Sequence, residues 1–216
     1  MIKNYIFDLD GTIVNSSMEV LACFKKAFKK ADYEIDESRL THNVIGPPLK
    51  QILKLIAPNL DDEKKLEEIV KHFRDIYDNN ENDISIMYEG MFDYLKSLKD
   101  EGCKVFMATF KPMIHTMRIV KMLNIEEFFD DIYTIDKFNS RITKEEMIKD
   151  ILYIWGLKPE ETVMIGDAPT DMTAAKANNV RGIGVLWGYG SDKEPLKQTA
   201  DVVVNDVEEL RACLKA

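Results

Sequence analysis

The sequence has few cysteines and no long apolar segment. Its three cysteines, Cys23, Cys103 and Cys213, are odd in number and far apart, which argues against a disulfide framework and against a zinc site. No apolar run approaches the roughly 20 residues that a membrane-spanning helix needs, and the first residues lack the pattern of a secretion signal. We therefore expect a cytoplasmic protein that contacts no membrane.

Basic charge and nucleotide-binding loops are also scarce. The formal net charge is -9 and the pI is near 5.0, which argues against binding to nucleic acid or to an anionic membrane surface. The pattern G-x-x-x-x-G-K-[ST] does not occur, and the glycines at 182, 184 and 188 have the wrong spacing for G-x-G-x-x-G. An anionic substrate would need a local positive group, such as a metal ion.

The sequence does contain short apolar runs that alternate with helical patterns. The predicted strands are Tyr5–Phe7, Val105–Ala108, Ile132–Ile135, Val163–Ile165, Ile183–Leu186 and Val202–Val204. The predicted helices between them are Met91–Leu98, Met113–Leu123, Lys144–Trp155, Asp171–Asn178 and Val207–Leu214. This alternation predicts an α/β fold with a doubly wound parallel sheet covered on both faces.

One segment breaks the alternation, because residues 15–88 contain no convincing strand. Three helices are predicted there, at Ser17–Ala31, Leu49–Ile56 and Asp62–Tyr77, with Ser16 and Glu19 as a capping box on the first. We expect residues 1–14 and 89–216 to form an α/β catalytic core and residues 15–88 to form an inserted helical cap.

Two carboxylates follow the first predicted strand, in the stretch YIFDLDGT. Asp8 and Asp10 would point the same way along an extended backbone, roughly 6–7 Å apart at the usual strand rise. Two such charges repel unless a cation lies between them, which favours a hard metal such as Mg²⁺. A strand that simply ends in a polar turn would give the same local pattern.

A second acidic stretch, TVMIGDAPTD, repeats this arrangement after a later strand. Asp167 stands where it would complete a metal site begun by Asp8 and Asp10, since ligands of open parallel sheets bind at the carboxyl ends of the strands. Asp171 begins a predicted helix. Its role would be either that of an acid favoured by the helix dipole or that of a group that orients a neighbouring cation.

Hydrogen-bonding and cationic groups complete the set. Thr109 ends the strand KVFMAT, and it and the amides after it, including that of Phe110, would suit either a phosphate oxygen or a plain helix cap. Lys144 begins a helix inside the capping box Thr143-x-x-Glu146, where a cation opposes the helix dipole. Contact with an anion would account for a lysine in this unfavourable place, although lysines at helix starts are common.

These elements, in this order, resemble the haloacid dehalogenase superfamily of phosphohydrolases, and specifically its phosphoglycolate phosphatase-like branch. The motifs are DLDGT at 8–12, Thr109, Lys144 and GDAPTD at 166–171, with a helical cap inserted after the first. Each motif is weak alone, whereas the four together span the chain.

The resemblance implies a role for each motif residue. Asp8 would be the nucleophile that forms an aspartyl-phosphate, and Asp10 the general acid and base. Mg²⁺ would be held by Asp8, the backbone carbonyl of Asp10, and Asp167. The implied phosphate-binding residues are Thr109, Phe110 and Lys144, and Asp171 would be a supporting carboxylate near Lys144 or the water shell of the metal.

The sequence departs from the pattern of this family at two positions. Many relatives carry Asp where this chain has Asn15, and a small polar residue where it has Phe110. The phenylalanine would either narrow the site or leave only a backbone amide to bind phosphate. A phosphosugar mutase would share the core motifs, but such relatives usually have a histidine at the position of Val20. A receiver-type switch also has a phosphorylated aspartate, although its acceptor is not on the first strand.

We therefore predict a Mg²⁺-dependent phosphatase that acts on a small phosphorylated metabolite and works as a monomer or weak dimer. A mutase and a non-catalytic phosphate-accepting switch are the alternatives. The identity of the metabolite does not follow from the fold.

Overall fold

The computed structural model describes the chain except residues 46–48, 81–83, 138–141, 190–191 and 215–216. The described residues group into two compact units. The core unit consists of Met1–Asn15, Ile86–Gly188 and Asp192–Ala216, and the helical unit consists of Ser16–Ser85 together with Tyr189. The interpretation of residues 15–88 as a cap domain stays a prediction.

The core unit is built on a parallel sheet of six strands. They are β1 (Asn4–Phe7), β4 (Lys104–Thr109), β5 (Asp131–Thr134), β6 (Thr162–Gly166), β7 (Arg181–Val185) and β8 (Val202–Val204), in the spatial order β5-β4-β1-β6-β7-β8. Every neighbouring pair is parallel. The predicted doubly wound α/β fold is confirmed, and β1 lies at the centre, between β4 and β6.

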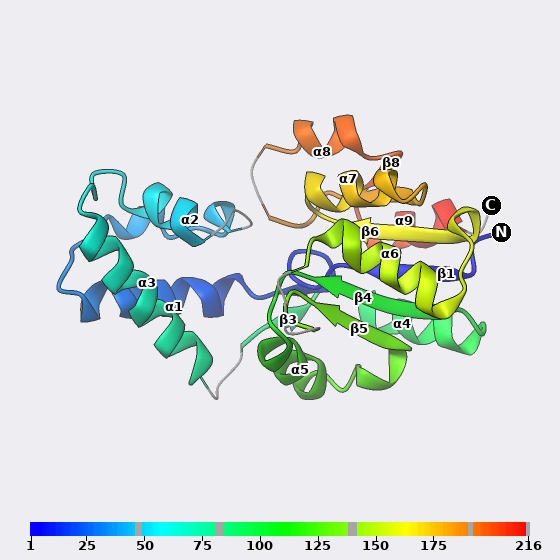
Figure 1. Ribbon diagram of the computed structural model, residues 1–216, viewed down its shortest axis with the longest axis horizontal. Coiled ribbons are helices and arrows are strands. Elements are labelled where there is room, and N and C mark those ends of the chain that lie inside the picture. The colour runs from blue at the N-terminus through cyan, green and yellow to red at the C-terminus, as the bar shows by residue number, and fades with distance from the viewer. Residues whose placement is uncertain (46–48, 81–83, 138–141, 190–191, 215–216) are drawn as a thin grey trace. The chain divides into compact units, whose positions relative to one another are not determined.

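Helices cover both faces of this sheet because side chains along each strand alternate between the faces. Tyr5 and Phe7 of β1 point into one apolar cluster, while Ile6 points into the other. The helices of the first cluster are α4 (Met91–Asp100), α5 (Met113–Met122) and α9 (Val207–Leu214); those of the second are α6 (Lys144–Trp155) and α7 (Pro169–Ala177). Figure 1 shows α4 and α6 on opposite sides of the sheet.

The helical unit has an apolar core of its own. Its helices are α1 (Ser17–Lys30), α2 (Leu49–Ile56) and α3 (Glu63–Asp78). Helices α1 and α3 pack through Phe24 and Phe73, whose ring centroids are 4.3 Å apart, and the side chain of Asp62 caps α3 by accepting hydrogen bonds from the Lys64 and Lys65 amides. The three predicted helices of this segment are present.

Two short strands and one short α-helix of the described structure were not predicted. Strands β2 (Val14–Asn15) and β3 (Ile86–Met87) form an antiparallel pair at the two ends of the helical insertion. Helix α8 (Glu194–Thr199) follows β7. The prediction that residues 15–88 hold no strand is therefore wrong at both ends, because two-residue strands are too short to show a hydrophobic period.

The two predicted capping boxes have different outcomes. The box on α6 forms, since Thr143 Oγ1 accepts from the Glu146 amide at 3.2 Å and Glu146 accepts from the Thr143 amide at 2.7 Å. The box on α1 does not form in the described structure: Ser16 makes no side-chain cap hydrogen bond. Its hydroxyl instead lies 3.1 Å from the Tyr189 hydroxyl, because a tertiary partner competes with the local cap.

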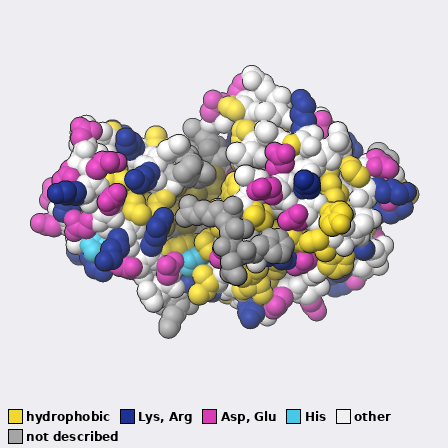
Figure 2. Space-filling view, in the orientation of Figure 1, with side chains coloured by type: hydrophobic (Ala, Val, Ile, Leu, Met, Phe, Trp, Pro, Cys, Tyr) yellow, Lys and Arg dark blue, Asp and Glu magenta, His cyan; other side chains and the backbone are white. Residues whose placement is uncertain are grey.

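The surface carries both signs of charge. On the face shown in Figure 2, lysine and arginine side chains are interspersed with acidic ones over both units. Within the described part of the chain, none of the helices has the length and apolar character needed to cross a membrane.

Candidate active site

The predicted site residues come from neighbouring strands of the sheet. Asp8 follows β1, Thr109 ends β4 and Asp167 follows β6. Because β1 lies between β4 and β6 and all three are parallel, their carboxyl ends meet at one edge. The chain leaves β4 and β6 toward helices on opposite faces, so this edge is the switch point at which open α/β sheets bind ligands.

Lys144 joins two buried carboxylates at this edge. Its ammonium lies 2.9 Å from Asp8 Oδ2 and donates a short hydrogen bond to Asp171 Oδ1. The Lys144 side chain is 3% exposed and that of Asp171 is fully buried. The other Asp171 oxygen accepts from the Ala168 amide at 3.0 Å. Asp171, on the first turn of α7, therefore holds the ammonium of Lys144 in place. Its role as a supporting carboxylate in catalysis stays a prediction.

Burial and charge perturb the pKa values of this group. Burial, with the nearby Asp171 carboxylate adding to it, raises the pKa of Asp8 from its ordinary value near 3.8 to about 7, although Lys144 opposes the shift. Burial alone would lower the pKa of Lys144, but the Asp171 and Asp8 carboxylates outweigh it and hold that pKa above its usual range. Lys144 is thus shared between two carboxylates, and its charge offsets the effect of burial on the pKa of Asp8 only in part.

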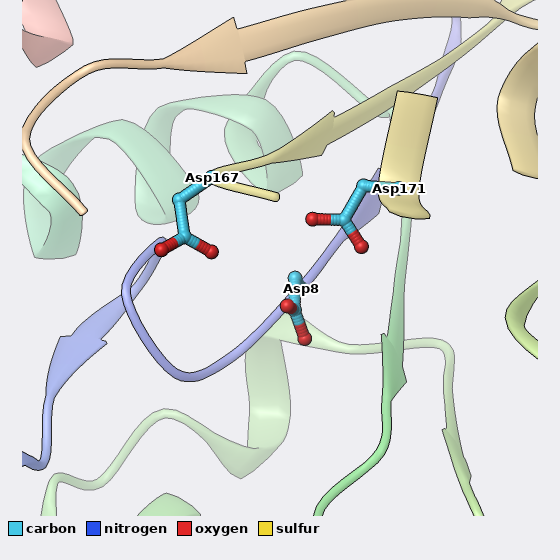
Figure 3. A group of neighbouring side chains, drawn as sticks. All are labelled: Asp8, Asp167 and Asp171. Atoms are coloured by element: carbon cyan, nitrogen blue, oxygen red, sulfur yellow. The ribbon is translucent and has the colours of Figure 1, made fainter. Parts of the chain in front are cut away.

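Three carboxylates lie close enough to share a metal ion. One oxygen each of Asp8, Asp167 and Asp171 falls within 4.8 Å of the others, and all three residues are buried. Figure 3 shows the three side chains near one another, Asp8 from the loop after β1, Asp167 from the end of β6 and Asp171 from α7. Oxygen donors of this kind suit Mg²⁺.

The backbone around Asp167 is shaped to admit its carboxylate. A Cβ on Gly11 would lie 2.2 Å from Asp167 Oδ2, and one on Gly188 would lie 2.2 Å from Asp167 Cβ. Gly11 also has a φ of +78°, a conformation that favours glycine. The donor set and this cradle fit the predicted metal. The assignment of Asp8 and Asp167 as the side-chain ligands stays a prediction.

Asp10 does not join the carboxylate cluster with its side chain. Its two oxygens lie 3.1 and 3.3 Å from the Lys111 ammonium, in a pair where Lys111 is 5% exposed and Asp10 is 26% exposed. The predicted ligand from Asp10 is its backbone carbonyl, and that assignment stays a prediction. The two carboxylates of DLDGT therefore pair with different lysines, Asp8 with Lys144 and Asp10 with Lys111.

Thr109 and Phe110 lie beside these pairs. Thr109 is buried, and its hydroxyl accepts a hydrogen bond from the Lys111 amide at 3.1 Å. The Phe110 ring is 44% exposed, and its centroid lies 5.1 Å from the Lys144 ammonium, a distance that permits a cation–π interaction. The predicted phosphate contacts of Thr109, Phe110 and Lys144 remain predictions. Lys144 contacts Asp8, Phe110 lies beside Lys144, and Thr109 contacts Lys111.

Sequence reasoning missed Lys111 as a site residue. Lys111 follows the strand-ending Thr109 by two residues, and its charge is visible in the sequence. Nothing in the sequence indicates that it reaches Asp10, which is 101 positions away. The adjacency of β1 and β4 supplies that information.

The chain belongs to the haloacid dehalogenase-like hydrolases. The model of this family matches residues 5–185, a span that includes every motif residue named above. The family predicted from the motifs is thereby confirmed.

Relatives within reach of sequence comparison carry several activity names. A 5'-nucleotidase of Pseudomonas aeruginosa is 30% identical over 99% of this chain and 96% of its own length. A pyrophosphatase PpaX of Bacillus pumilus is 27% identical over 100% of this chain and 97% of its own. A solved structure described as a predicted phosphatase of Clostridium acetobutylicum superposes with a TM-score of 0.81 at 30% identity, with 100% of both chains covered.

Proposed function

We propose that this protein is a Mg²⁺-dependent phosphatase that hydrolyses small phosphate monoesters through an aspartyl-phosphate on Asp8. The observation that carries the proposal is the contact of 2.9 Å between Asp8 and Lys144, inside a buried cluster of carboxylates at the switch point of the sheet. A 5'-nucleotidase and a pyrophosphatase among the relatives support the same class.

In the first step, an Asp8 oxygen attacks the phosphorus atom of the ester. A new O–P bond forms as the bond to the leaving oxygen breaks, and the leaving oxygen takes a proton from Asp10. Lys144 and Thr109 would bind the equatorial oxygens, whose charge must be neutralised in phosphoryl transfer. Asp171 keeps the ammonium of Lys144 directed toward Asp8.

In the second step, water attacks the phosphorus atom of the aspartyl-phosphate. Asp10, now a carboxylate, takes a proton from this water, the O–P bond to Asp8 breaks, and inorganic phosphate leaves. One carboxyl group thus acts as acid and then as base, which two-step hydrolysis requires. Its exposure of 26% is compatible with proton exchange between the steps.

The metal would be held by the carboxylates of Asp8 and Asp167 and by the backbone carbonyl of Asp10. When bound, Mg²⁺ supplies positive charge that offsets the charges of the carboxylates and the phosphate. The substrate we propose is a small phosphorylated metabolite, handled by a monomer or weak dimer without nucleic acid. Two named activities among the relatives, on nucleotides and on pyrophosphate, make these compounds the first to compare with 2-phosphoglycolate and sugar phosphates.

Phosphate release from such a panel, with Mg²⁺ and with a chelator, tests the proposal. We expect metal-dependent release that Asp8→Asn abolishes, while Asp93→Asn, a change of an exposed aspartate on α4, has no effect. A substrate that rearranges without releasing phosphate would instead identify a mutase. A stable phosphorylated protein without turnover would identify a switch.

A further inference from the structure

Lys111 and Asp10 form an ion pair that the mechanism above leaves without a role. The Lys111 ammonium lies within hydrogen-bonding distance of both Asp10 oxygens, at 3.1 and 3.3 Å, and its side chain is almost completely buried. Burying an ammonium costs hydration and side-chain freedom. The orientation that Lys111 gives to the Asp10 carboxyl group is therefore expected to have a function.

The backbone that carries Lys111 is fixed on both sides. Its amide donates to the Thr109 hydroxyl at 3.1 Å, and its carbonyl accepts from the Thr116 hydroxyl at 3.3 Å. Pro112 follows, with φ at -61°, as the N-cap of α5. The lysine stem therefore starts from a rigid turn at the end of β4, and the ammonium is aimed at the neighbouring loop after β1.

Lys111 and Lys144 form ion pairs with different carboxylates. Lys144 pairs with Asp8 and Asp171, and Lys111 pairs with Asp10. The two carboxylates that follow β1 are thus held by separate lysines from separate elements. This division allows Asp10 to be oriented independently of the group that attacks phosphorus.

We propose that Lys111 is a positioning residue that holds the Asp10 carboxyl group in the orientation for proton transfer, a role that rests on the proposed phosphatase mechanism. Because the ammonium contacts both oxygens, one oxygen can carry a proton to or from the reacting group while the other keeps its hydrogen bond. Without the lysine, the carboxyl group rotates among side-chain conformers and spends less time aligned with the leaving oxygen or the attacking water.

The dependence of rate on the leaving group tests this role. An aryl phosphate such as 4-nitrophenyl phosphate expels a stable anion and needs little protonation, whereas an alkyl phosphate needs the acid. In single-turnover assays with Mg²⁺, we expect Lys111→Met to slow alcohol release from the best alkyl phosphate of the panel by about 10- to 100-fold, given the usual effect of misplacing a catalytic group. Release of 4-nitrophenol should change by less than about threefold on the same reasoning.

The second step gives an independent readout. Since Asp10 must also activate water, Lys111→Met should release 4-nitrophenol in a fast burst and then lose its phosphate slowly, so that the aspartyl-phosphate accumulates. The changes should also be non-additive with Asp10→Asn, because a carboxamide gains little from being positioned. A lysine that only binds phosphate would slow both substrates alike and add to the Asp10→Asn effect.

Lys99→Met is the matched control. Lys99 pairs with Asp130 at 2.8 Å in the same unit, and Asp130 also accepts from the amide of Val105 at the amino end of β4, away from Asp10. This variant loses a partly buried lysine–aspartate pair but should keep the wild-type ratio of alkyl to aryl rates. Lys111→Gln retains a hydrogen-bond donor and should give an intermediate ratio, so it carries the test if Lys111→Met does not fold.

Each outcome bears on the proposal. A lowered ratio of alkyl to aryl rates together with non-additivity supports positioning by Lys111. An unchanged ratio, or effects that add to those of Asp10→Asn, overturns it while leaving the phosphatase class intact. If the wild-type protein turns over neither substrate, the proposed function fails first and the positioning role fails with it.

Discussion

The buried carboxyl group of Asp8 predicts a pH dependence of folding stability in the metal-free protein. Its pKa rises from about 3.8 to about 7 on folding, chiefly through burial. Between these values the native protein keeps a proton that the unfolded chain loses. Stability is therefore expected to fall as pH rises through this window and to change no further above it, by about 4 kcal/mol in total for this one group.

Asp8→Asn isolates this contribution because the carboxamide is close in shape and does not titrate. Between pH 5 and pH 8, the wild-type protein should lose about 2 to 3 kcal/mol relative to the variant, by the same linkage relation. Urea unfolding with a chelator present measures the difference at each pH. Both tryptophans of the chain, Trp155 and Trp187, belong to the core unit, so their fluorescence reports on the unit that contains Asp8.

One result would show that the pKa of Asp8 is not raised on folding. If the stability difference between wild type and Asp8→Asn is the same at pH 5 and pH 8, burial does not raise the pKa of Asp8 and the electrostatic account of the site is wrong. Asp93→Asn, which changes an exposed carboxylate on α4, should show no such pH-dependent difference.

Three further predictions concern the groups around Asp8. Lys144→Met leaves the buried carboxylates of Asp8 and Asp171 without their lysine, so the free energy of unfolding at neutral pH should fall by about 3 kcal/mol, measured by urea unfolding; an unchanged midpoint would contradict the role of this ion pair. Asp167→Asn should weaken Mg²⁺ binding at least tenfold by calorimetry without destabilising the metal-free protein, whereas equal affinity would remove Asp167 from the ligand set. Gly11→Ala places a Cβ within 2.2 Å of Asp167 Oδ2 at a positive φ. It should therefore lower the free energy of unfolding by more than about 1 kcal/mol and also weaken Mg²⁺ binding. A variant with normal stability and affinity would show that the Asp167 carboxylate does not need a glycine at this position.

Much of the core fold was predictable because its signals are local. A strand such as β6 is a short apolar run that ends in glycine and aspartate, and α6 has a capping box whose two hydrogen bonds form as the sequence predicts. The antiparallel pair of β2 and β3 was not predictable. Its two-residue strands lie about 70 positions apart and depend on pairing rather than on any local pattern.

The same distinction applies to the site. The sequence identifies Asp8, Asp167 and Lys144 as candidates because each stands at the end of a strand or the start of a helix. The family resemblance places Asp171 near Lys144 or the metal, but the sequence does not indicate that Lys144 also contacts Asp8 or that Lys111 contacts Asp10. Those facts depend on the order of strands in the sheet, since Lys111 reaches Asp10 only because β4 is the neighbour of β1. The capping box predicted at Ser16 failed for a related reason, a partner distant in sequence.

The separate lysines explain how one short loop can hold two carboxylates with different duties. Asp8 must be ionised to attack phosphorus, yet in the metal-free protein burial and the nearby Asp171 carboxylate raise its pKa to about 7, although Lys144 opposes the shift. A cation at the Asp167 side would favour the ionised form of Asp8, so metal binding and nucleophile activation are expected to be coupled. Asp10 must change its protonation state in each half-reaction, and it is the more exposed acid and has a lysine that contacts both of its oxygens. The difference between a buried acid that shares its lysine and a partly exposed acid with its own is therefore the physical basis for assigning attack to Asp8 and proton transfer to Asp10.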